Sequence, residues 1–173
     1  MEKLHSKKFI GGFLLAGFLI SVIFACILIR DENAVRTITP GETASLEGME
    51  IISKIESIEL PEEKGGRMRI TGYLFKRGES IRTVAVQIIM RDTGTGSCLS
   101  LPTAVITNMD VLETYAEDGC DYNNAGFEAF ADCRGRFDPY NKSYDLFALY
   151  TLNGTEYFVP LGGTVGNGGG NNE

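Results

Sequence analysis

The stretch YDLFALYTLNGTEYFVPL, residues 144–161, decides the fold of this chain. Residues 144–152 are apolar at nearly every position, as in a strand with neighbours on both sides, and residues 156–161 form a second apolar run. Between the runs stands Asn153-Gly154, a pair that favours the left-handed backbone of a two-residue turn. The stretch therefore predicts a β-hairpin whose first strand lies in the interior of a sheet.

Alternation with a period of two residues predicts further strands before this hairpin. Apolar residues recur at every second position in three segments, with polar or charged side chains between most of them. The apolar positions are Met68, Ile70 and Leu74; Val84, Val86, Ile88 and Met90; and Phe127, Ala129, Ala131 and Cys133. Residues 49–60 have a less regular pattern, but the turn residues Pro61 and Gly65-Gly66 follow them and favour one more strand.

One short helix is predicted among these strands. Asp110 and Glu113 have the spacing of a helix capping box, Tyr115 adds to an apolar face, and Gly119 follows as a terminator. Six or seven short strands separated by turns are typical of two packed sheets. We therefore expect an all-β domain over residues 49–161, an immunoglobulin-like or jelly-roll-type β-sandwich with one short helix.

The N-terminal part of the chain has a different pattern. Residues 9–29, FIGGFLLAGFLISVIFACILI, contain no charged residue. At ~1.5 Å of rise per residue a helix of this length spans roughly 30 Å, the thickness of a bilayer core. A single transmembrane helix is thus predicted, preceded by a cytoplasmic tip of residues 1–8. Two alternatives stay open, a cleaved signal peptide and a lipoprotein that carries its lipid on Cys26.

Charges on the two sides of the predicted helix indicate its orientation. Lys3, Lys7 and Lys8 precede it, whereas Asp31 and Glu32 follow it, and positive residues favour the cytoplasmic side. From Asp31 onward the chain holds 22 acidic against 12 basic residues, which argues against binding to nucleic acid. We expect a single-pass protein of the cell membrane, with its N-terminus in the cytoplasm and its domain outside.

Two segments that flank the domain lack the pattern of a packed element. Residues 30–48 contain Pro40 and Gly41 and show no sustained period, which predicts a stalk between helix and domain. Residues 162–173, GGTVGNGGGNNE, are rich in glycine and asparagine, and such a composition cannot bury a core. We expect a disordered tail there.

The predicted outer domain carries few of the side chains that enzymes use. The single histidine, His5, lies in the cytoplasmic tip, so the domain has no Ser-His or Cys-His pair and no histidine ligand for a metal. Two carboxylates could still perform acid–base hydrolysis, although no spacing singles out a pair. The sequence thus predicts a protein without catalytic residues or a cofactor, with a small carboxylate-based hydrolase as an alternative.

The cysteines of the domain leave their pairing open. Cys98, Cys120 and Cys133 are an odd number and cannot pair completely within one chain. Cys120 and Cys133 flank a turn-rich segment and could form a disulfide in an oxidising compartment. Three free thiols are the alternative.

The most polar loop, residues 117–124, reads EDGCDYNN. Asp121, Tyr122 and Asn123 combine an aromatic ring for stacking with side chains that can bind sugar hydroxyls, so they are the candidate ligand-binding residues. Asp118 and Asp121 could instead hold a calcium ion, although their spacing does not match an EF-hand and an acidic turn is the simpler interpretation. Other aromatic residues at polar-face or turn positions are Tyr73, Phe130 and Tyr140.

Small residues recur at every fourth position of the predicted membrane helix, at Gly17, Ser21 and Ala25. Residues four apart lie on one face of a helix. Small side chains let helices approach closely in a membrane, which favours a helix-mediated dimer or a partner helix, although small residues are common in any membrane helix.

Five short motifs follow one another along the domain. They read Ile55-Glu56-Ser57-Ile58, Ile70-Thr71-Gly72-Tyr73-Leu74-Phe75, Asp110-Val111, Gly126-Phe127 and Tyr144-Asp145-Leu146. In this order and spacing, residues 50–161 resemble an accessory β-sandwich domain that accompanies bacterial surface-polysaccharide glycosyltransferases. Tyr73 stands where tryptophan is commoner in that family, and the enzyme portion that usually carries the domain is absent from this sequence. The resemblance implies a domain displayed at a bacterial envelope near glycan machinery, without catalytic residues of its own.

These observations together predict a membrane-anchored, non-enzymatic binding or accessory module. Its expected partners are an envelope glycan or a membrane protein, besides the lipid bilayer around residues 9–29. A surface-assembly component such as a minor pilin is the main alternative, because it also begins with a basic tip and an apolar helix. Against that alternative, no glutamate occurs early in the apolar run, and Pro40-Gly41 would stop an extended helix.

Overall fold

The structure is a computed structural model, and it describes residues 14–166 except 28–33, 63–64 and 134–136. The strands are β1 Arg36–Ile38, β2 Ile51–Glu59, β3 Arg67–Lys76, β4 Val84–Asp92, β5 Cys98–Ser100, β6 Thr103–Ile106, β7 Gly126–Asp132, β8 Ser143–Leu152 and β9 Thr155–Gly166. The short helices between β6 and β7 are the α-helix α2, Met109–Thr114, and the 3-10 helix η1, Ala116–Asp118.

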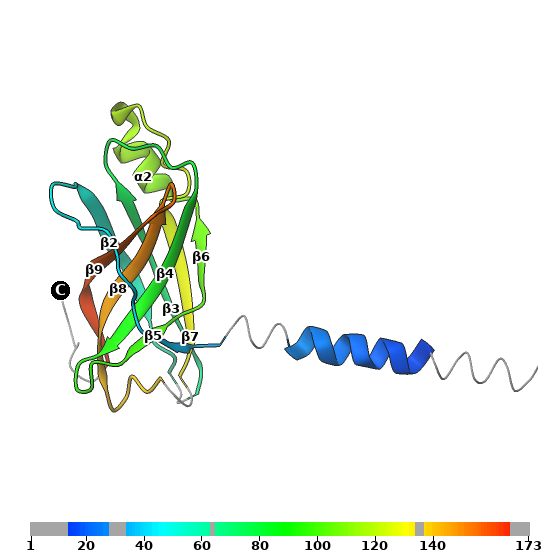
Figure 1. Ribbon diagram of the computed structural model, residues 1–173. Helices are drawn as coiled ribbons and strands as arrows, with labels where there is room; N and C mark the ends of the chain where they lie inside the picture. Colours follow the sequence, from blue (N-terminus) through cyan, green and yellow to red (C-terminus); the bar gives the residue numbers. More distant parts are fainter. Residues whose placement is uncertain (1–13, 28–33, 63–64, 134–136, 167–173) are drawn as a thin grey trace, which may run out of the picture. The chain divides into compact units, whose positions relative to one another are not determined.

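The strands form two antiparallel sheets (Figure 1). One sheet has the order β1-β5-β4-β8-β9 and the other the order β2-β3-β7-β6. The prediction of an all-β fold is confirmed, and β8 is an interior strand between β4 and β9 as predicted. The predicted hairpin is confirmed as well, since β8 and β9 meet at Asn153 (φ 49°) and Gly154 (φ 90°), the left-handed backbone that an Asn-Gly turn favours.

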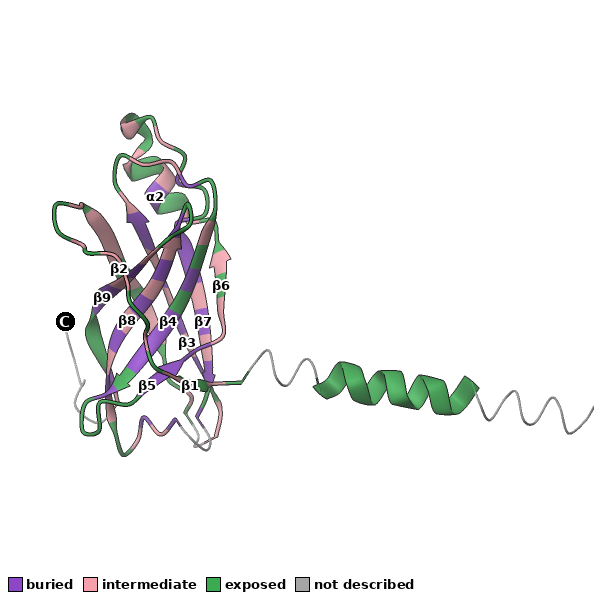
Figure 2. Ribbon diagram, in the orientation of Figure 1, coloured by how far each residue is buried: buried purple, intermediate pink, exposed green. Residues whose placement is uncertain are grey.

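Buried residues lie on strands of both sheets (Figure 2). They form a single hydrophobic cluster, so the domain is a two-layer β-sandwich. Alternating residues of each strand supply it, because successive side chains of a strand point to opposite faces. The predicted apolar positions of β3, β4 and β7 are confirmed as buried at Met68, Ile70, Leu74, Val86, Ile88, Met90, Phe127, Ala129, Ala131 and Cys133. Val84, at the start of β4, is half-buried and packs against the cluster.

Gly72 marks the closest approach of β3 to its neighbours. A Cβ atom at this position would lie 2.2 Å from the Lys54 carbonyl oxygen and 2.8 Å from the Phe127 ring. The same point carries a register shift in the β2–β3 pairing, between Ile55 and Ser57. Glycine is therefore required for the bulged strand β2 to reach β3 without a steric clash.

The segment before β2 belongs to the sandwich. β1 pairs with β5, the Ala44 amide donates to the Glu156 carbonyl oxygen at 2.8 Å, and Leu46 packs against the core. The prediction of a stalk over residues 30–48 is therefore wrong where the structure describes this segment, from residue 34 onward. A three-residue strand has too few positions to show an alternation in the sequence.

The C-terminal strand is longer than the sequence predicts. β9 continues through Gly166, and Val165 is only 2% exposed. Gly162 and Gly163 have positive φ angles, at a register shift that lets the strand resume beyond a bulge. The prediction of a disordered tail over residues 162–173 is therefore wrong up to Gly166, and the remainder lies outside the described residues.

The chain divides into two compact units, Met1–Ala34 and Val35–Glu173, and the first contains a helix of residues 14–27. In this helix the Ser21 hydroxyl donates to the Gly17 carbonyl oxygen at 3.0 Å. Within the described residues, no helix has the length and apolarity to cross a membrane. The predicted span of residues 9–29 runs past the described residues at both ends, and the predicted tip, before it, lies wholly outside them.

Candidate functional site

Helix α2 is fixed to β2 by its N-cap residue. The Asn108 side-chain oxygen accepts from the Val111 amide at 3.0 Å, and its side-chain nitrogen donates to Glu56 Oε1 of β2 at 3.1 Å. Val111, only 1% exposed, anchors the helix in the core. The capping box predicted at Asp110 and Glu113 is therefore wrong, because Asn108 has the extended backbone of an N-cap residue two positions earlier.

Aromatic rings from β3 and the segment after α2 pack together. The Phe75 ring lies 4.9 Å from Tyr115, in an edge-to-face arrangement, and 4.5 Å from Tyr122, measured between centroids. The Tyr73 centroid is 6.3 Å from that of Phe75. Phe75 and Tyr122 are buried, whereas Tyr73 and Tyr115 are half-buried. The cluster thus gives the two outer tyrosines a rigid support.

A groove of about 220 Å³ lies where α2 meets β2 and β3, and we call it the α2 groove. Its lining residues are Lys54, Tyr73, Asp110, Val111, Glu113, Thr114 and Tyr115. Lys54 and Tyr73 are directly opposite each other on β2 and β3. The groove is smaller than the ~300–1,000 Å³ of ordinary small-molecule sites, so it suits a single ring of a longer ligand.

The charged groups of the α2 groove are not neutralised by one another. Among the described residues, Lys54, Asp110 and Glu113 take part in no ion pair. Asp118, in contrast, accepts from two guanidinium nitrogens of Arg77 at 3.0 and 3.2 Å, and its pKa is lowered mainly by these hydrogen bonds. The groove therefore offers hydrogen-bonding groups that the fold itself does not occupy.

The environment of the groove raises the pKa of the Tyr73 phenol. Burial raises the pKa of Tyr73 first, and the charges of Tyr115, Glu56 and Asp110 raise that pKa further. The phenol stays protonated at neutral pH and can donate a hydrogen bond to a ligand.

The loop predicted to bind a ligand is organised differently from the expectation. Tyr122 is only 1% exposed, and its hydroxyl accepts from the Gly78 amide at 2.8 Å and donates to Asp118 at 3.3 Å. Its ring cannot stack on a sugar, so the prediction of Tyr122 as a binding platform is wrong. The neighbouring Asp121 and Asn123 are exposed, and the Asn123 amide donates to the Asp121 carboxylate at 3.0 Å.

The fold does not bring together the residues that the sequence offered as a metal site and as a disulfide. Asp118 is engaged by Arg77, and no group of three or more His, Cys, Asp or Glu side chains among the described residues could hold a metal ion. Cys120 and Cys133 are free thiols at opposite ends of β3, next to Gly78 and Gly66. A ten-residue strand spans roughly 30 Å, whereas a disulfide needs Cα atoms within about 7 Å.

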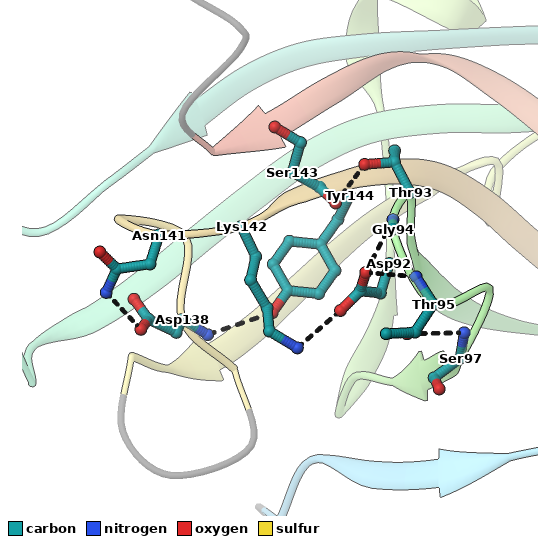
Figure 3. Close-up of polar contacts among 10 residues, drawn as sticks. All are labelled: Asp92, Thr93, Gly94, Thr95, Ser97, Asp138, Asn141, Lys142, Ser143 and Tyr144. Carbon is teal, nitrogen blue, oxygen red and sulfur yellow. Dashed lines mark hydrogen bonds and ion pairs between the residues drawn. The ribbon is translucent and has the colours of Figure 1, made fainter.

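A second polar cluster lies at the turn between β4 and β5 (Figure 3). Its centre is the buried carboxylate of Asp92, which accepts from Lys142 Nζ at 2.7 Å and from the amides of Gly94 and Thr95, each at 2.9 Å. These bonds, chiefly that from Lys142, lower the pKa of Asp92 to about 2. A hollow of about 340 Å³ lies at this turn, and its lining includes the bonded pair Asp92 and Lys142.

The loop on the other side of that turn is tied down by its own hydrogen bonds (Figure 3). The Asp138 amide donates to the Tyr144 hydroxyl at 3.2 Å, and the Asn141 side chain donates to the Asp138 carboxylate at 2.6 Å. The Thr93 hydroxyl donates to the Ser143 carbonyl oxygen at 3.1 Å. We therefore assign this cluster a structural role.

The outer face of the five-stranded sheet is apolar along β8 and β9. The rings of Phe147 and Phe158 stack with centroids 4.8 Å apart, and the Arg91 guanidinium lies 4.4 Å from the Phe147 centroid. Leu149 and Phe158 face each other across the two strands, and both are half-buried. This face explains why the sequence of β8 is apolar at nearly every position.

Sequence reasoning found some residues of the α2 groove but did not bring them together. It identified Tyr73 as an aromatic on a polar face and Asp110 and Glu113 as helix residues. Lys54 and Thr114 carried no signal, because a single lysine or threonine is ordinary on a surface. Their proximity depends on the β2–β3 register and on the Asn108 cap, and no local pattern reports either of these.

Comparison with known proteins finds no matching protein-family model, curated protein or solved structure for this chain.

Proposed function

We propose that this chain is a membrane-anchored, non-enzymatic module that displays its β-sandwich outside the cytoplasm and binds a glycan of the bacterial envelope in the α2 groove. One observation carries the proposal: two rigidly supported tyrosines, Tyr73 and Tyr115, line a groove together with a cation and two carboxylates that form no ion pair within the described part of the chain. Sugar rings stack on aromatic faces, and their hydroxyls bind charged and amide groups.

The anchor part of the proposal rests on the apolar run of residues 9–29 and on the charges beside it. One face of the helix of residues 14–27 carries the small residues Gly17, Ser21 and Ala25. This face supports a helix-mediated contact with a second copy or a membrane partner. A display role also fits the two-sheet architecture, which we assign to the immunoglobulin-like or jelly-roll type of sandwich.

A glycan array of bacterial envelope polysaccharides, followed by calorimetry on the full chain in detergent micelles, tests the glycan part. We expect a dissociation constant between tens of micromolar and millimolar, which is roughly 4–6 kcal/mol of binding free energy. Tyr73→Ala should weaken binding about 3- to 10-fold, the scale of one aromatic contact. Phe130→Ala is the matched control, since Phe130 is a half-buried aromatic of the same sheet outside the groove.

A second candidate function is docking onto a membrane protein, and the apolar outer face of β8 and β9 favours it. Phe147, Leu149 and Phe158 present an apolar surface beside Arg91, the composition of a protein-binding patch. Leu149→Glu should then abolish cross-linking to one recurrent membrane partner in cells and leave glycan binding unchanged. If Tyr73→Ala abolishes both activities, the two surfaces are not independent and this second candidate fails.

A further inference from the structure

The α2 groove has an excess of negative charge beside its aromatic rings. Asp110 and Glu113 line it against the single cation Lys54, and Glu56 lies next to it, where its only recorded partner among the described residues is the neutral Asn108 side chain. Two other acids near α2, Asp118 and Glu50, are bonded by Arg77. The groove therefore has a net negative charge next to its aromatic rings.

Aromatic rings and carboxylates in one groove suit a cation. The face of a tyrosine ring attracts ammonium groups through its quadrupole, and an adjacent carboxylate adds a charge-assisted hydrogen bond. Burial is the main cause of the raised pKa of Tyr73, and the nearby charges of Tyr115, Glu56 and Asp110 raise that pKa further. Arg77, whose guanidinium lies 5.7 Å from the Tyr115 centroid, shows that a cation already uses one of these rings.

We infer that the α2 groove selects a glycan that carries a protonated amino group, an amino sugar without its N-acetyl group. The ammonium group sits at the carboxylates of Asp110 and Glu113, and the sugar ring stacks on Tyr73. Lys54 donates to a hydroxyl of the same or the next sugar. This inference rests on the proposed glycan-binding function and names the ligand class for the same groove.

Two oligosaccharides with the same backbone test it on the full chain in detergent micelles, the β-1,4-linked tetramer of glucosamine and that of N-acetylglucosamine. The titrations are made at about pH 6, where the amine of the glucosamine tetramer is protonated. We expect the glucosamine tetramer to bind about 10-fold more tightly, the product of two exposed ion pairs worth roughly 3-fold each. Asp110→Asn and Glu113→Gln should each reduce that preference roughly 3-fold.

Asp121→Asn is the matched control, because Asp121 is an exposed carboxylate of a loop outside the groove. If this variant lowers binding of the cationic tetramer as much as Asp110→Asn does, the attraction is diffuse and the inference is wrong. Equal binding of both tetramers, lost in Tyr73→Ala, overturns the amino-sugar specificity but leaves the glycan-binding function standing. Binding of neither tetramer, while an array glycan binds in a Tyr73-dependent way, also overturns the specificity alone. No glycan binding of any kind overturns both.

Discussion

The two ends of the β-sandwich both gather tyrosines, acids and a lysine, yet they use them in opposite ways. At the β4–β5 turn Lys142 donates a hydrogen bond to the Asp92 carboxylate, and two backbone amides donate to the same carboxylate. At α2, Asp110, Glu113 and Lys54 line a groove without forming ion pairs among the described residues.

This difference separates polar groups that stabilise the fold from polar groups that are available to a ligand. A buried carboxylate is tolerated only when its charge is compensated, so Asp92 cannot lose its partners without a cost in stability. The carboxylates of the α2 groove are solvated and can exchange water for a ligand at little cost. Stability measurements should therefore respond to one end of the sandwich and binding measurements to the other.

The largest expected effect is on the aromatic support of the groove. Tyr122→Ala removes a buried ring that packs on Phe75 and two hydrogen bonds of its hydroxyl, so it should lower the free energy of unfolding by about 3–5 kcal/mol. Chemical denaturation measures this loss. Tyr122→Phe, which keeps the ring, should cost only about 1–2 kcal/mol. A stable Tyr122→Ala protein that has lost only ligand binding would restore Tyr122 as a binding residue.

Removal of the Asp92 carboxylate should have the next largest effect. Asp92→Ala leaves the Gly94 and Thr95 amides and Lys142 without their acceptor, and we expect a loss of about 2–3 kcal/mol in unfolding free energy. Asp145→Asn is the control on β8, since its exposed pair with Arg91 should contribute less than ~1 kcal/mol. Similar losses in the two variants would contradict a special role of Asp92.

The pH dependence of Asp92 follows from its lowered pKa. The folded pKa of about 2 lies below the ordinary value of 3.8, so the carboxylate contributes its full stabilisation above pH ~4. That contribution is lost as the pH falls through about 2, because protonation removes the charge that Lys142 and the amides bind. The stability difference between the natural chain and Asp92→Ala should shrink over this range in acid denaturation. A constant difference would show that the charge does not matter.

A smaller effect should follow from shortening the chain at its first strand. A protein that begins at residue 49 lacks β1 and the packing of Val35 and Leu46, and should be roughly 1–3 kcal/mol less stable than one that begins at residue 34. Thermal unfolding of the two forms compares them directly. Equal stability would mean that the predicted stalk, residues 30–48, describes this segment better than the sandwich does.

The smallest expected effect on stability comes from the groove itself. Asp110→Asn alters an exposed side chain and should change the unfolding free energy by less than ~0.5 kcal/mol, whereas Tyr73→Ala removes a half-buried ring at the edge of the core and should cost about 1 kcal/mol. Both should weaken glycan binding. If either variant loses more unfolding free energy than binding free energy, the main role of that residue is in packing and not in binding.

Strands with a full alternation could be predicted from the sequence, and so could the β8–β9 turn. Four or more alternating positions specify which face is buried, and Asn153-Gly154 specifies the turn by its backbone preference alone. β1 and the end of β9 could not be predicted in this way. β1 is three residues long, and β9 reaches Val165 only across two glycines whose bulge depends on pairing with β8.

The candidate site shows the same limit for side chains. Tyr122 stands between the polar residues Asp121 and Asn123, whereas Tyr73 is followed by the apolar Leu74 and Phe75. The structure nevertheless buries Tyr122 against Phe75 and leaves Tyr73 only half-buried. The disulfide between Cys120 and Cys133 could not be judged from the sequence either. The two cysteines are only 13 positions apart in the chain, but they lie near opposite ends of β3. Contacts between residues distant in the chain decide which polar residue is free to bind.

Chemical-shift mapping tests the central claim most directly. The isotope-labelled full chain in micelles would be titrated with an envelope glycan that binds on the array, and amide shifts would be followed by two-dimensional NMR. Our account predicts that the perturbed amides centre on Lys54, Tyr73 and residues 110–115, with those around Asp92 unchanged. Glycan binding in the α2 groove would be contradicted if the shifted amides centred on the outer face of β8 and β9. It would also be contradicted if the glycan saturated the protein without shifting any amide at α2.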